Sequence, residues 1–303
     1  MSPIPVSSST TPFWRTELHE FDSHRITPDL PSNCDIVIFG AGFVGAALVY
    51  YLYDENPSPP AVIILEAREA CSGATGRNGQ FAVHGHMKPD VYYQDLVEKE
   101  KVDCDFVLTR DRDATLDPKL ARDTHYAFIE LQKSGIADLK DVFYAHGKEA
   151  DQLTKSSGVK GALPCFTFTA GHVWPYKMVM HLLQTAVTGA NLQTHTPVTR
   201  ISDTPLPDGR WLAHTERGTI KAKKILIATN GYTAYLGPQF QDKIVAVRGI
   251  CSRNSPPDFM PYVGEVPGKP NPMILAGFSG YGMAMILLSA KVMGQMIRHG
   301  LKF

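Results

Sequence analysis

The sequence predicts an α/β fold whose first unit is a strand, a helix and a second strand within residues 35–66. Three observations support this prediction. Residues 35–39 are short, apolar and β-branched, which is typical of a buried parallel strand. A compact helical run follows at 44–53. A second apolar run, residues 61–65, is followed directly by Glu66.

Three glycines, Gly40, Gly42 and Gly45, join the first strand to the helix with the spacing G-x-G-x-x-G. Gly40 permits a tight turn, Gly42 lets the backbone approach a pyrophosphate, and Gly45 lets the helix pack closely on the strand. The start of the helix offers N–H groups to that pyrophosphate. Glu66 follows Gly45 by 21 residues, where an acid can accept ribose hydroxyls. The sequence therefore predicts a dinucleotide site; the alternative is a glycine-rich turn without a ligand.

The composition is typical of a globular protein, with 44% hydrophobic and 20% charged residues among 303. A chain of this length can form one large domain or two ordinary ones. Thirty basic residues balance thirty acidic ones and no basic run occurs, so we expect no nucleic-acid partner. No apolar stretch approaches the ~20 residues that cross a bilayer, so we expect no membrane partner.

The cysteine pattern indicates the redox state of the cellular compartment in which the protein works. The five cysteines are odd in number and show no C-x-x-C spacing. We therefore expect neither a disulfide framework nor a metal site, and we expect a reducing compartment, the cytoplasm.

The organisation along the chain predicts an N-terminal arm and two domains. The arm is rich in Ser, Thr and Pro, and it is either ordered or a mobile tail. Phe13 and Trp14 indicate that part of it packs on the rest of the protein. The predicted boundaries are 1–32 for the arm, 33–90 with 185–303 for a discontinuous cofactor domain, and 91–184 for a mostly helical substrate domain.

Further elements follow from caps, turns and apolar spacing. Asp117 and Pro118 are typical of a helix start, and Pro175 opens another helix with one buried face. Predicted helices are 117–133, one from Pro175 and one over 283–297. Predicted strands are 161–169, 198–201, 210–215, 219–222, one from Lys224 into the turn 228–231, and 273–277.

Three further segments indicate which dinucleotide binds. They are the glycine-rich loop 71–79, the turn 228–231 and the glycine loop 278–282 before the last helix. An extended FAD must be held at its adenosine, pyrophosphate, ribityl chain and flavin by segments from both ends of a chain. A nicotinamide enzyme would instead show further strand–helix units after the first. The pattern therefore favours FAD.

These motifs resemble those of the D-amino-acid-oxidase-type FAD-dependent oxidoreductases, which include glycine oxidase, sarcosine oxidase and γ-glutamylputrescine oxidoreductase. The Gly-Ala-Thr-Gly-Arg-Asn-Gly loop at 73–79 is most similar to that of fungal members. The resemblance covers nearly the whole chain from about residue 12. It implies an FAD-binding Rossmann-like domain of the glutathione-reductase type and a mixed α+β substrate domain.

The resemblance also implies the cofactor-binding residues. One group would hold the ADP half of FAD, a second would run beside the ribityl chain and flavin, and others would meet the adenine, the pyrophosphate and the flavin pyrimidine edge. In that order they are Gly40, Gly42, Phe43, Val44, Gly45, Glu66 and Ala67; Ser72, Thr75, Arg77, Asn78 and Gly79; Val198; Thr229, Asn230 and Gly231; and Gly280, Tyr281, Gly282 and Met283.

The chain departs from the family pattern in three places. Residues 80–84 are interposed before the segment 85–90, and a helix before 95–103 is shortened. Residues 244–253 normally lead into several antiparallel strands, but here only 254–260 precede the next matching segment. We therefore expect an internally shortened chain with an incomplete substrate domain.

The resemblance implies oxidation of the C–N bond of a small amine or amino acid. Hydride would pass to flavin N5, water would hydrolyse the imine, and oxygen would reoxidise the flavin to give hydrogen peroxide. No catalytic acid or base is assigned. Two alternatives stay open: a flavin dehydrogenase that uses another electron acceptor, and a catalytically impaired remnant of such an enzyme.

Overall fold

A computed structural model describes most of the chain. The described residues are 5, 9–78, 89–113, 115–135, 139–145, 151–152, 155, 160–163, 166–186, 188–244, 261–278 and 282–301. The chain divides into two compact units, Met1–Gly79 with Trp174–Phe303, and Gln80–Val173.

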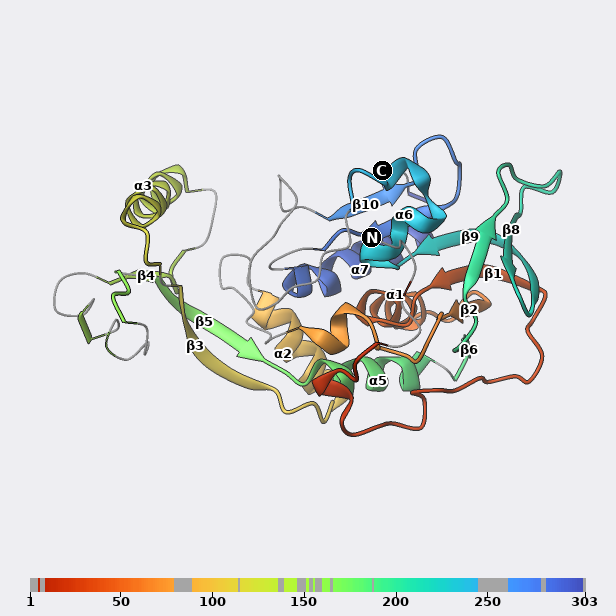
Figure 1. Cartoon of the computed structure of the whole chain (residues 1–303), viewed down its shortest axis with the longest axis horizontal. Coiled ribbons are helices and arrows are strands. Elements are labelled where there is room, and N and C mark those ends of the chain that lie inside the picture. The colour runs from red at the N-terminus through yellow and green to blue at the C-terminus, as the bar shows by residue number, and fades with distance from the viewer. Residues whose placement is uncertain are drawn as a thin grey trace. The chain divides into compact units, whose positions relative to one another are not determined.

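The first unit is built on an eight-stranded sheet (Figure 1). Six strands follow one another in the order β10–β11–β9–β1–β2–β6. Their bounds are Tyr262–Glu265, Met273–Ala276, Gly218–Ile227, Asn33–Phe39, Val62–Leu65 and Asn191–Gln193. The other two strands, β7 (Val198–Ile201) and β8 (Trp211–Thr215), pair with each other, and β8 also pairs with β9.

The centre of this sheet is parallel, as the apolar run of residues 35–39 predicts. β1 pairs in parallel with both β2 and β9, and β6 and β11 extend the parallel set on either side. Consequently the chain leaves β1, β2, β9 and β11 at the same edge of the sheet. β10 runs antiparallel to β11, and β8 runs antiparallel to the first half of β9.

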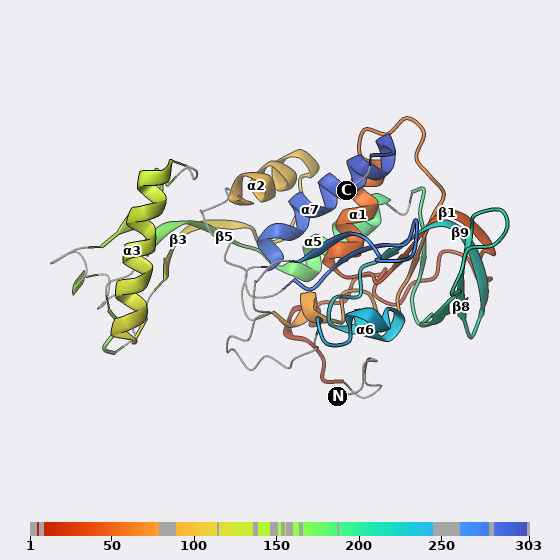
Figure 2. The same cartoon turned by 90° about the horizontal axis from the view of Figure 1, so that it is seen from above.

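Helices cover one face of the sheet (Figure 2). They are α1 (Phe43–Tyr53), α5 (Pro175–Ala186) and α7 (Gly282–His299), and α1 contacts the other two. α7 comes close to α1 because Gly294 has no side chain: a Cβ there would lie 3.2 Å from Tyr51 Cβ. Arg298 then donates to the carbonyls of Asp54 and Glu55 and satisfies the end of α1 (2.9 and 3.1 Å).

The opposite face carries a large buried apolar cluster. Val37, Phe39 and Ile227 of the central strands pack in one buried cluster with Trp211 of β8 and with Phe240. Phe240 belongs to a short region formed by η4 (Asn230–Tyr232), α6 (Thr233–Leu236) and η5 (Pro238–Phe240). Burying Trp211 and Phe240 contributes several kcal/mol of apolar transfer free energy, about 2–3 for each large side chain.

Two predicted strands are in fact one. Residues 219–222 and the strand from Lys224 form the single strand β9, because Gly218–Ala222 pairs with β8 on one side while β1 pairs along the other. The polar residues Lys221, Lys223 and Lys224 interrupt the apolar pattern without interrupting the pairing.

The N-terminal arm is ordered where it is described, from Ser9 to Ser32. Arg25 forms an antiparallel bridge with Gln193, and Ile26 N–H donates to the carbonyl of Leu192 (3.0 Å). This pairing covers the free edge of β6, which would otherwise leave backbone groups unpaired. The short helix η1 (Phe13–Arg15) lies nearer the N-terminus of the arm.

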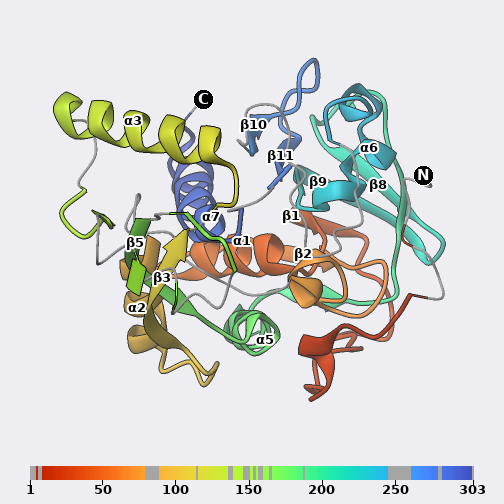
Figure 3. The ribbon, with the colours of Figure 1, turned by 60° about the vertical axis from the view of Figure 1, so that its left-hand side comes forward.

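The second unit contains a three-stranded antiparallel sheet with the order β3–β5–β4. Figure 3 shows β3 beside β5. The strands are Val107–Asp113, Phe166–His172 and Phe143–Tyr144, and the helices are α2 (Pro89–Glu100) and α3 (Pro118–Ser134). β3 was not predicted, and β5 begins five residues later than the predicted strand 161–169.

The predicted helix at 117–133 is confirmed. The carboxylate of Asp117 accepts the N–H of Lys119 (2.8 Å) at its start, and Gly135 closes it at φ 65°. Phe128 packs with Phe166 and Phe168 of β5 in a small apolar cluster. No residue of α3 is fully buried.

Within the described part of the chain, no helix is long and apolar enough to cross a membrane.

Candidate cofactor site

The predicted site segments meet at the carboxyl edge of the parallel strands. β1 is followed by the first glycine turn, β2 by Glu66, β9 by Ala228–Asn230, and β11 by Gly277. Backbone hydrogen bonds join them: Gly40 N–H donates to the carbonyl of Leu65 (2.8 Å), and Ala228 N–H donates to that of Phe39 (3.0 Å). In open α/β sheets this edge is where ligands bind.

The first glycine turn is sterically demanding at two of its three glycines. Gly40 has φ +106°, and a Cβ there would lie 2.8 Å from the carbonyl oxygen of Ala228. A Cβ on Gly45 would lie 1.9 Å from the carbonyl oxygen of Gly40. Gly42 differs, because a Cβ there would meet only Thr75 Oγ1 at 3.5 Å. Gly40 and Gly45 are therefore required by packing, whereas Gly42 leaves space beside the turn.

The start of α1 follows this turn. Phe43 and Val44 are buried, and Gly42 caps the helix without a side-chain acceptor. The hydroxyl of Thr75 accepts the N–H of Phe43 (3.2 Å), so the second glycine-rich loop lies directly against the helix start. A helix N-terminus with backbone N–H groups is a favourable position for a phosphate.

Glu66 is held against the glycine turn. One carboxylate oxygen accepts the N–H of Ala41 (2.8 Å) and the other accepts the N–H of Arg68 (3.0 Å). Burial raises the pKa of the carboxyl, and the hydrogen bonds from Ala41 and Arg68 partly oppose that shift. Ala67, between them, is partly buried.

The second glycine-rich loop packs on the first. Cys71 N–H donates to the carbonyl of Ala41 (3.0 Å). The 3-10 helix η2 (Ala74–Arg77) follows, and Gly76 is required there because a Cβ would lie 2.4 Å from the carbonyl oxygen of Cys71. Arg77 donates through Nε to the carbonyl of Ser72 (3.0 Å) and through its other nitrogens to Thr10. The guanidinium of Arg77 therefore stabilises the conformation of the loop to which Arg77 belongs.

Several polar atoms around this loop are buried and have no hydrogen-bond partner. They are Ser72 Oγ, both side-chain amide atoms of Asn78, and Arg68 Nε. Such atoms are costly unless a ligand or water satisfies them. Because two of these residues were predicted to lie beside a cofactor, the atoms fit an elongated polar ligand along this loop.

The turn after β9 connects two parts of the site. Asn230 adopts φ +43°, and its side-chain oxygen accepts the N–H groups of Gly277 (2.9 Å) and Phe278 (3.0 Å). Thr229 contacts Thr233 through their hydroxyls (3.1 Å), and Gly231 lies within η4. Asn230 thus fixes the end of β11 beside the end of β9.

Val198 begins β7, near the segment that leads from Glu66. Thr196 N–H donates to the carbonyl of Glu66 (2.8 Å), and His195 N–H donates to that of Arg68 (3.0 Å). Val198 itself pairs with Thr215 and packs at the margin of the apolar cluster that contains Trp211 and Phe240. The backbone around Val198 therefore follows the same side of the site as Glu66.

The last predicted segment is only partly described. Gly282 is the first residue of α7 and is buried, and a Cβ there would lie 2.5 Å from Phe278 Cβ. Met283 follows it and is partly buried. Gly79, Gly280 and Tyr281, which were also predicted to bind the cofactor, lie outside the described residues.

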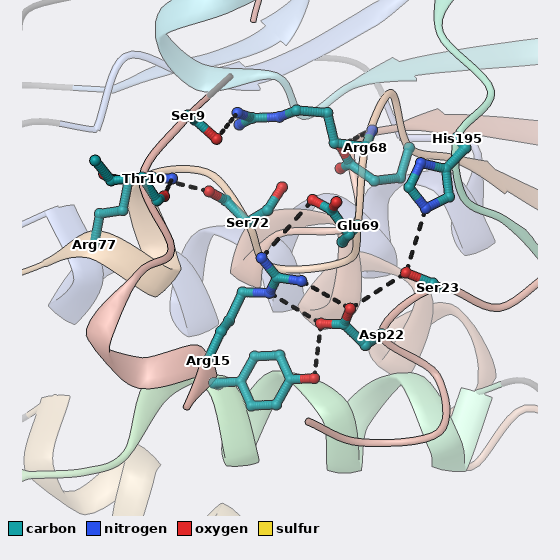
Figure 4. Close-up of polar contacts among 12 residues, drawn as sticks. Ser9, Thr10, Arg15, Asp22, Ser23, Arg68, Glu69, Ser72, Arg77 and His195 are labelled. Atoms are coloured by element: carbon teal, nitrogen blue, oxygen red, sulfur yellow. Dashed lines mark hydrogen bonds and ion pairs between the residues drawn. The ribbon is translucent and has the colours of Figure 1, made fainter. Parts of the chain in front are cut away.

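Residues of the N-terminal arm also reach the site, and the sequence did not predict this (Figure 4). Ser9 accepts a hydrogen bond from Arg68 (3.2 Å), and Thr10 accepts from Arg77. Trp14 Nε1–H donates to the carbonyl of Asn78 (2.7 Å). The aromatic pair at positions 13 and 14 was the one signal that this segment packs on the protein.

In the described part of the chain, His, Cys, Asp and Glu side chains form no group of three that could hold a metal ion.

Comparisons with known proteins agree with this arrangement. A family model described as DAO, FAD dependent oxidoreductase, matches residues 35–256. A search of curated proteins finds no match. The solved structures that resemble the chain include glycine oxidase from Geobacillus kaustophilus, with a TM-score of 0.70, 16% identity, and coverage of 89% of this chain and 95% of that one.

Two more solved structures are similar. One is an L-amino acid deaminase from Proteus vulgaris, with a TM-score of 0.73, 14% identity, and coverage of 92% of this chain and 94% of that one. The other is an L-α-glycerophosphate oxidase from Mycoplasma pneumoniae with FAD bound, with a TM-score of 0.62, 14% identity, and coverage of 89% and 95%. At these identities the likeness establishes the fold.

The family model covers well over half of the chain and includes the glycine turn, Glu66, the loop 71–78 and the turn after β9. The unsatisfied polar atoms of Ser72 and Asn78 fit its cofactor, FAD. The chain therefore belongs to the D-amino-acid-oxidase-type family of FAD-dependent oxidoreductases.

Proposed function

We propose that the chain holds FAD along the carboxyl edge of β1, β2, β9 and β11 and oxidises a small amine or amino acid. The observation that carries the proposal is the meeting of four separated turns at this edge, with buried polar atoms of Ser72 and Asn78 left without partners. Bound FAD would supply the two-electron acceptor for the reaction.

The chain's own groups have distinct roles in this proposal. The turn Gly40–Gly45 and the start of α1 would bind the pyrophosphate, and Glu66 would accept ribose hydroxyls. Ser72 and Asn78 would donate or accept hydrogen bonds beside the flavin. Backbone N–H groups at the start of α7 would stabilise negative charge that gathers at the pyrimidine edge.

The proposed overall reaction oxidises the C–N bond of the substrate and gives a carbonyl, with the nitrogen released as ammonia from a primary amine or as an amine from a secondary one. Two electrons leave the substrate carbon as a hydride, the nitrogen loses a proton, and water hydrolyses the imine. Oxygen takes up the two electrons and two protons as hydrogen peroxide. The amine or amino-acid class rests on the motifs of the sequence, because the fold is shared with a glycerophosphate oxidase.

The test uses the purified protein loaded with FAD and kept free of oxygen. Glycine, sarcosine, D- and L-amino acids and diamines are each added in turn, and bleaching of the flavin absorption band at about 450 nm is recorded. We expect bleaching with at least one amine and none with glycerol 3-phosphate. Free FAD without protein is the control. Bleaching by glycerol 3-phosphate alone would overturn the proposed substrate class.

Admission of air then separates the proposed oxidase from a dehydrogenase. The oxidase reoxidises in air and releases one hydrogen peroxide for each substrate oxidised. A reduced protein that stays bleached in air, but recovers with a quinone or dye, would instead be a dehydrogenase.

One observation favours a second candidate, a catalytically impaired FAD-binding protein. In the second unit, Leu120 and Tyr126 on α3 and Phe143 of β4 are 42%, 68% and 55% exposed. Apolar surface of this kind fits a domain that lacks part of its sheet. FAD binding without bleaching by any of the amines and amino acids tested would support this candidate.

We also propose the cytoplasm as the compartment. Cys34 and Cys71 are buried thiols that form no disulfide. Fluorescence microscopy of the tagged full chain tests the assignment.

A further inference from the structure

The N-terminal arm contacts both ends of the loop that carries the unsatisfied polar atoms. Before the loop, the carbonyl of Asp22 accepts the N–H of Ala70 (2.8 Å), and Arg15 lies 3.7 Å from a carboxylate oxygen of Glu69. At the last residue of the loop, Trp14 Nε1–H donates to the carbonyl of Asn78 (2.7 Å). The arm therefore brackets residues 71–78 rather than touching them at one point.

The arm itself is firmly anchored. Arg15 is 9% exposed and pairs with both carboxylate oxygens of Asp22, at 2.9 and 2.7 Å. Tyr176 of α5 donates its hydroxyl to the same carboxylate (2.9 Å) and accepts the N–H of His19 (3.0 Å). Figure 4 shows Arg15 between Asp22 and Glu69. A bidentate pair with a further hydrogen bond holds this part of the arm in one geometry.

Trp14 is fixed from two sides. Its indole N–H holds the carbonyl of Asn78, and its own carbonyl accepts the indole N–H of Trp174 (2.7 Å). The two indole rings also meet edge to face, with centroids 5.5 Å apart. Phe13, beside it, stacks on Trp174 and meets the Trp14 ring edge to face, but it is 68% exposed and its side chain has no hydrogen-bonding atom.

The hydrogen bonds that run from Trp174 through Trp14 end at Asn78. Its carbonyl is held by Trp14, whereas both atoms of its side-chain amide are buried without a partner. Because the hydrogen bond from Trp14 fixes the backbone of Asn78, the side-chain amide has a restricted orientation. The amide is therefore preorganised to bind a ligand.

We propose that Trp14 is a positioning residue for the cofactor: it holds Asn78 in the orientation in which its amide binds the flavin part of FAD. The proposal rests on the proposed FAD site. It assigns the N-terminal arm to the cofactor site, although the arm precedes the first strand of the dinucleotide-binding unit.

The test compares variants that remove one hydrogen bond each and keep an aromatic ring. Trp14→Phe keeps a ring but removes the donor to Asn78, and Trp174→Phe removes the donor to Trp14. Phe13→Leu is the matched control, because it alters the same aromatic group without removing a hydrogen bond. For each full-length variant, the dissociation constant for FAD is measured by flavin fluorescence, and the melting temperature is measured without FAD.

We expect both tryptophan variants to bind FAD about fivefold more weakly, the effect of one neutral hydrogen bond. Phe13→Leu should bind FAD as the wild type does. In an Asn78→Ala background, Trp14→Phe should have no further effect, because the amide that it positions is gone. The visible flavin spectrum should shift in Trp14→Phe and in Asn78→Ala alike.

Three results would overturn the proposal. Unchanged FAD affinity in both tryptophan variants, with only a lower melting temperature, would make Trp14 merely structural. Independent, additive losses in Trp14→Phe and Asn78→Ala would separate Trp14 from Asn78. Failure of the wild-type protein to bind FAD would overturn the proposed function and this proposal together.

Discussion

Gly42 and Gly45 differ in what a side chain would meet, although they belong to one motif. A Cβ on Gly45 would overlap the carbonyl oxygen of Gly40 at 1.9 Å, whereas one on Gly42 would have ordinary contact with Thr75 at 3.5 Å. The motif therefore combines a packing requirement with an open approach for a ligand. Only the second of these is a functional requirement.

This difference predicts separable effects of two alanine substitutions. Gly45→Ala should lower the free energy of unfolding by about 3 kcal/mol, because backbone atoms must move. Gly42→Ala should change it by less than about 1 kcal/mol, yet weaken FAD binding about tenfold by filling the approach to the turn. Urea unfolding without FAD and an FAD titration measure the two effects. A stable Gly42→Ala variant with wild-type FAD affinity would remove Gly42 from the site.

Glu66 gives the site a pH dependence. Burial raises the pKa of its carboxyl above the ordinary value of 4.5 in the folded protein. The folded protein without FAD then holds this proton more tightly than the unfolded chain does. Its stability should therefore fall as pH rises from 4.5 to the raised pKa, and stay level above it.

FAD binding should change in the opposite direction over the same pH range. Ribose hydroxyls donate better to the ionised carboxylate, so the affinity of the wild type should increase as pH rises through the raised pKa. Glu66→Gln should show a flat profile and weaker binding at pH 7, by about tenfold. FAD titrations between pH 4.5 and 8 give both curves. Parallel curves for the two proteins would contradict this role of Glu66.

At this scale the sequence predicted the backbone requirements better than the side-chain contacts. The spacing of Gly40 and Gly45 indicates a turn, and the structure supplies the close contacts that require glycine there. Arg68 was not predicted, because its contact with the arm is a hydrogen bond to Ser9, 59 residues away, which no local pattern indicates.

Among the elements, the end of β9 and the end of β11 are held beside each other by one side chain, that of Asn230. The Asn230 amide oxygen accepts two N–H groups, from Gly277 and Phe278, and its own φ of +43° suits few residue types. Thr229–Gly231 was predicted to lie near the pyrophosphate. What the structure adds is that this turn holds Gly277 and Phe278, at the end of β11, in place.

We expect Asn230→Gly and Asn230→Asp to differ for this reason. Glycine tolerates the backbone angle but leaves two N–H groups without an acceptor, which should cost about 2 kcal/mol of stability and weaken FAD binding. Aspartate keeps an acceptor and should remain close to the wild type in both. Thermal unfolding and FAD titration of the two variants provide the comparison. Equal losses in both would contradict the role of the acceptor, because aspartate keeps an acceptor oxygen and glycine does not.

Elements with one dominant periodicity were predictable, and the others were not. The helix after Asp117 and the apolar stripe of α7 have strong local patterns, and both helices are present. β3 is polar and exposed at Arg110, and it is a strand because β5 offers it a partner far along the chain. Long-range pairing of this kind has no local pattern to reveal it.

For the molecule as a whole, the sheet explains why distant segments share one site. Because β1, β2, β9 and β11 are parallel, their carboxyl ends meet at one edge, and the turns that follow them converge. The parallel centre could be predicted from the apolar run at 35–39. The place of the N-terminal arm could not, because its contacts use backbone carbonyls and hydroxyls that follow no pattern.

The most direct test of this account is the visible absorption spectrum of the purified full-length chain, recorded with a thermal melt with and without added FAD. We predict an absorption band of bound flavin at about 450 nm. We also predict a melting temperature that rises with FAD concentration, because a ligand that binds only the folded state stabilises it. A colourless protein whose melting temperature does not change at any FAD concentration would contradict the convergence of these turns on a cofactor.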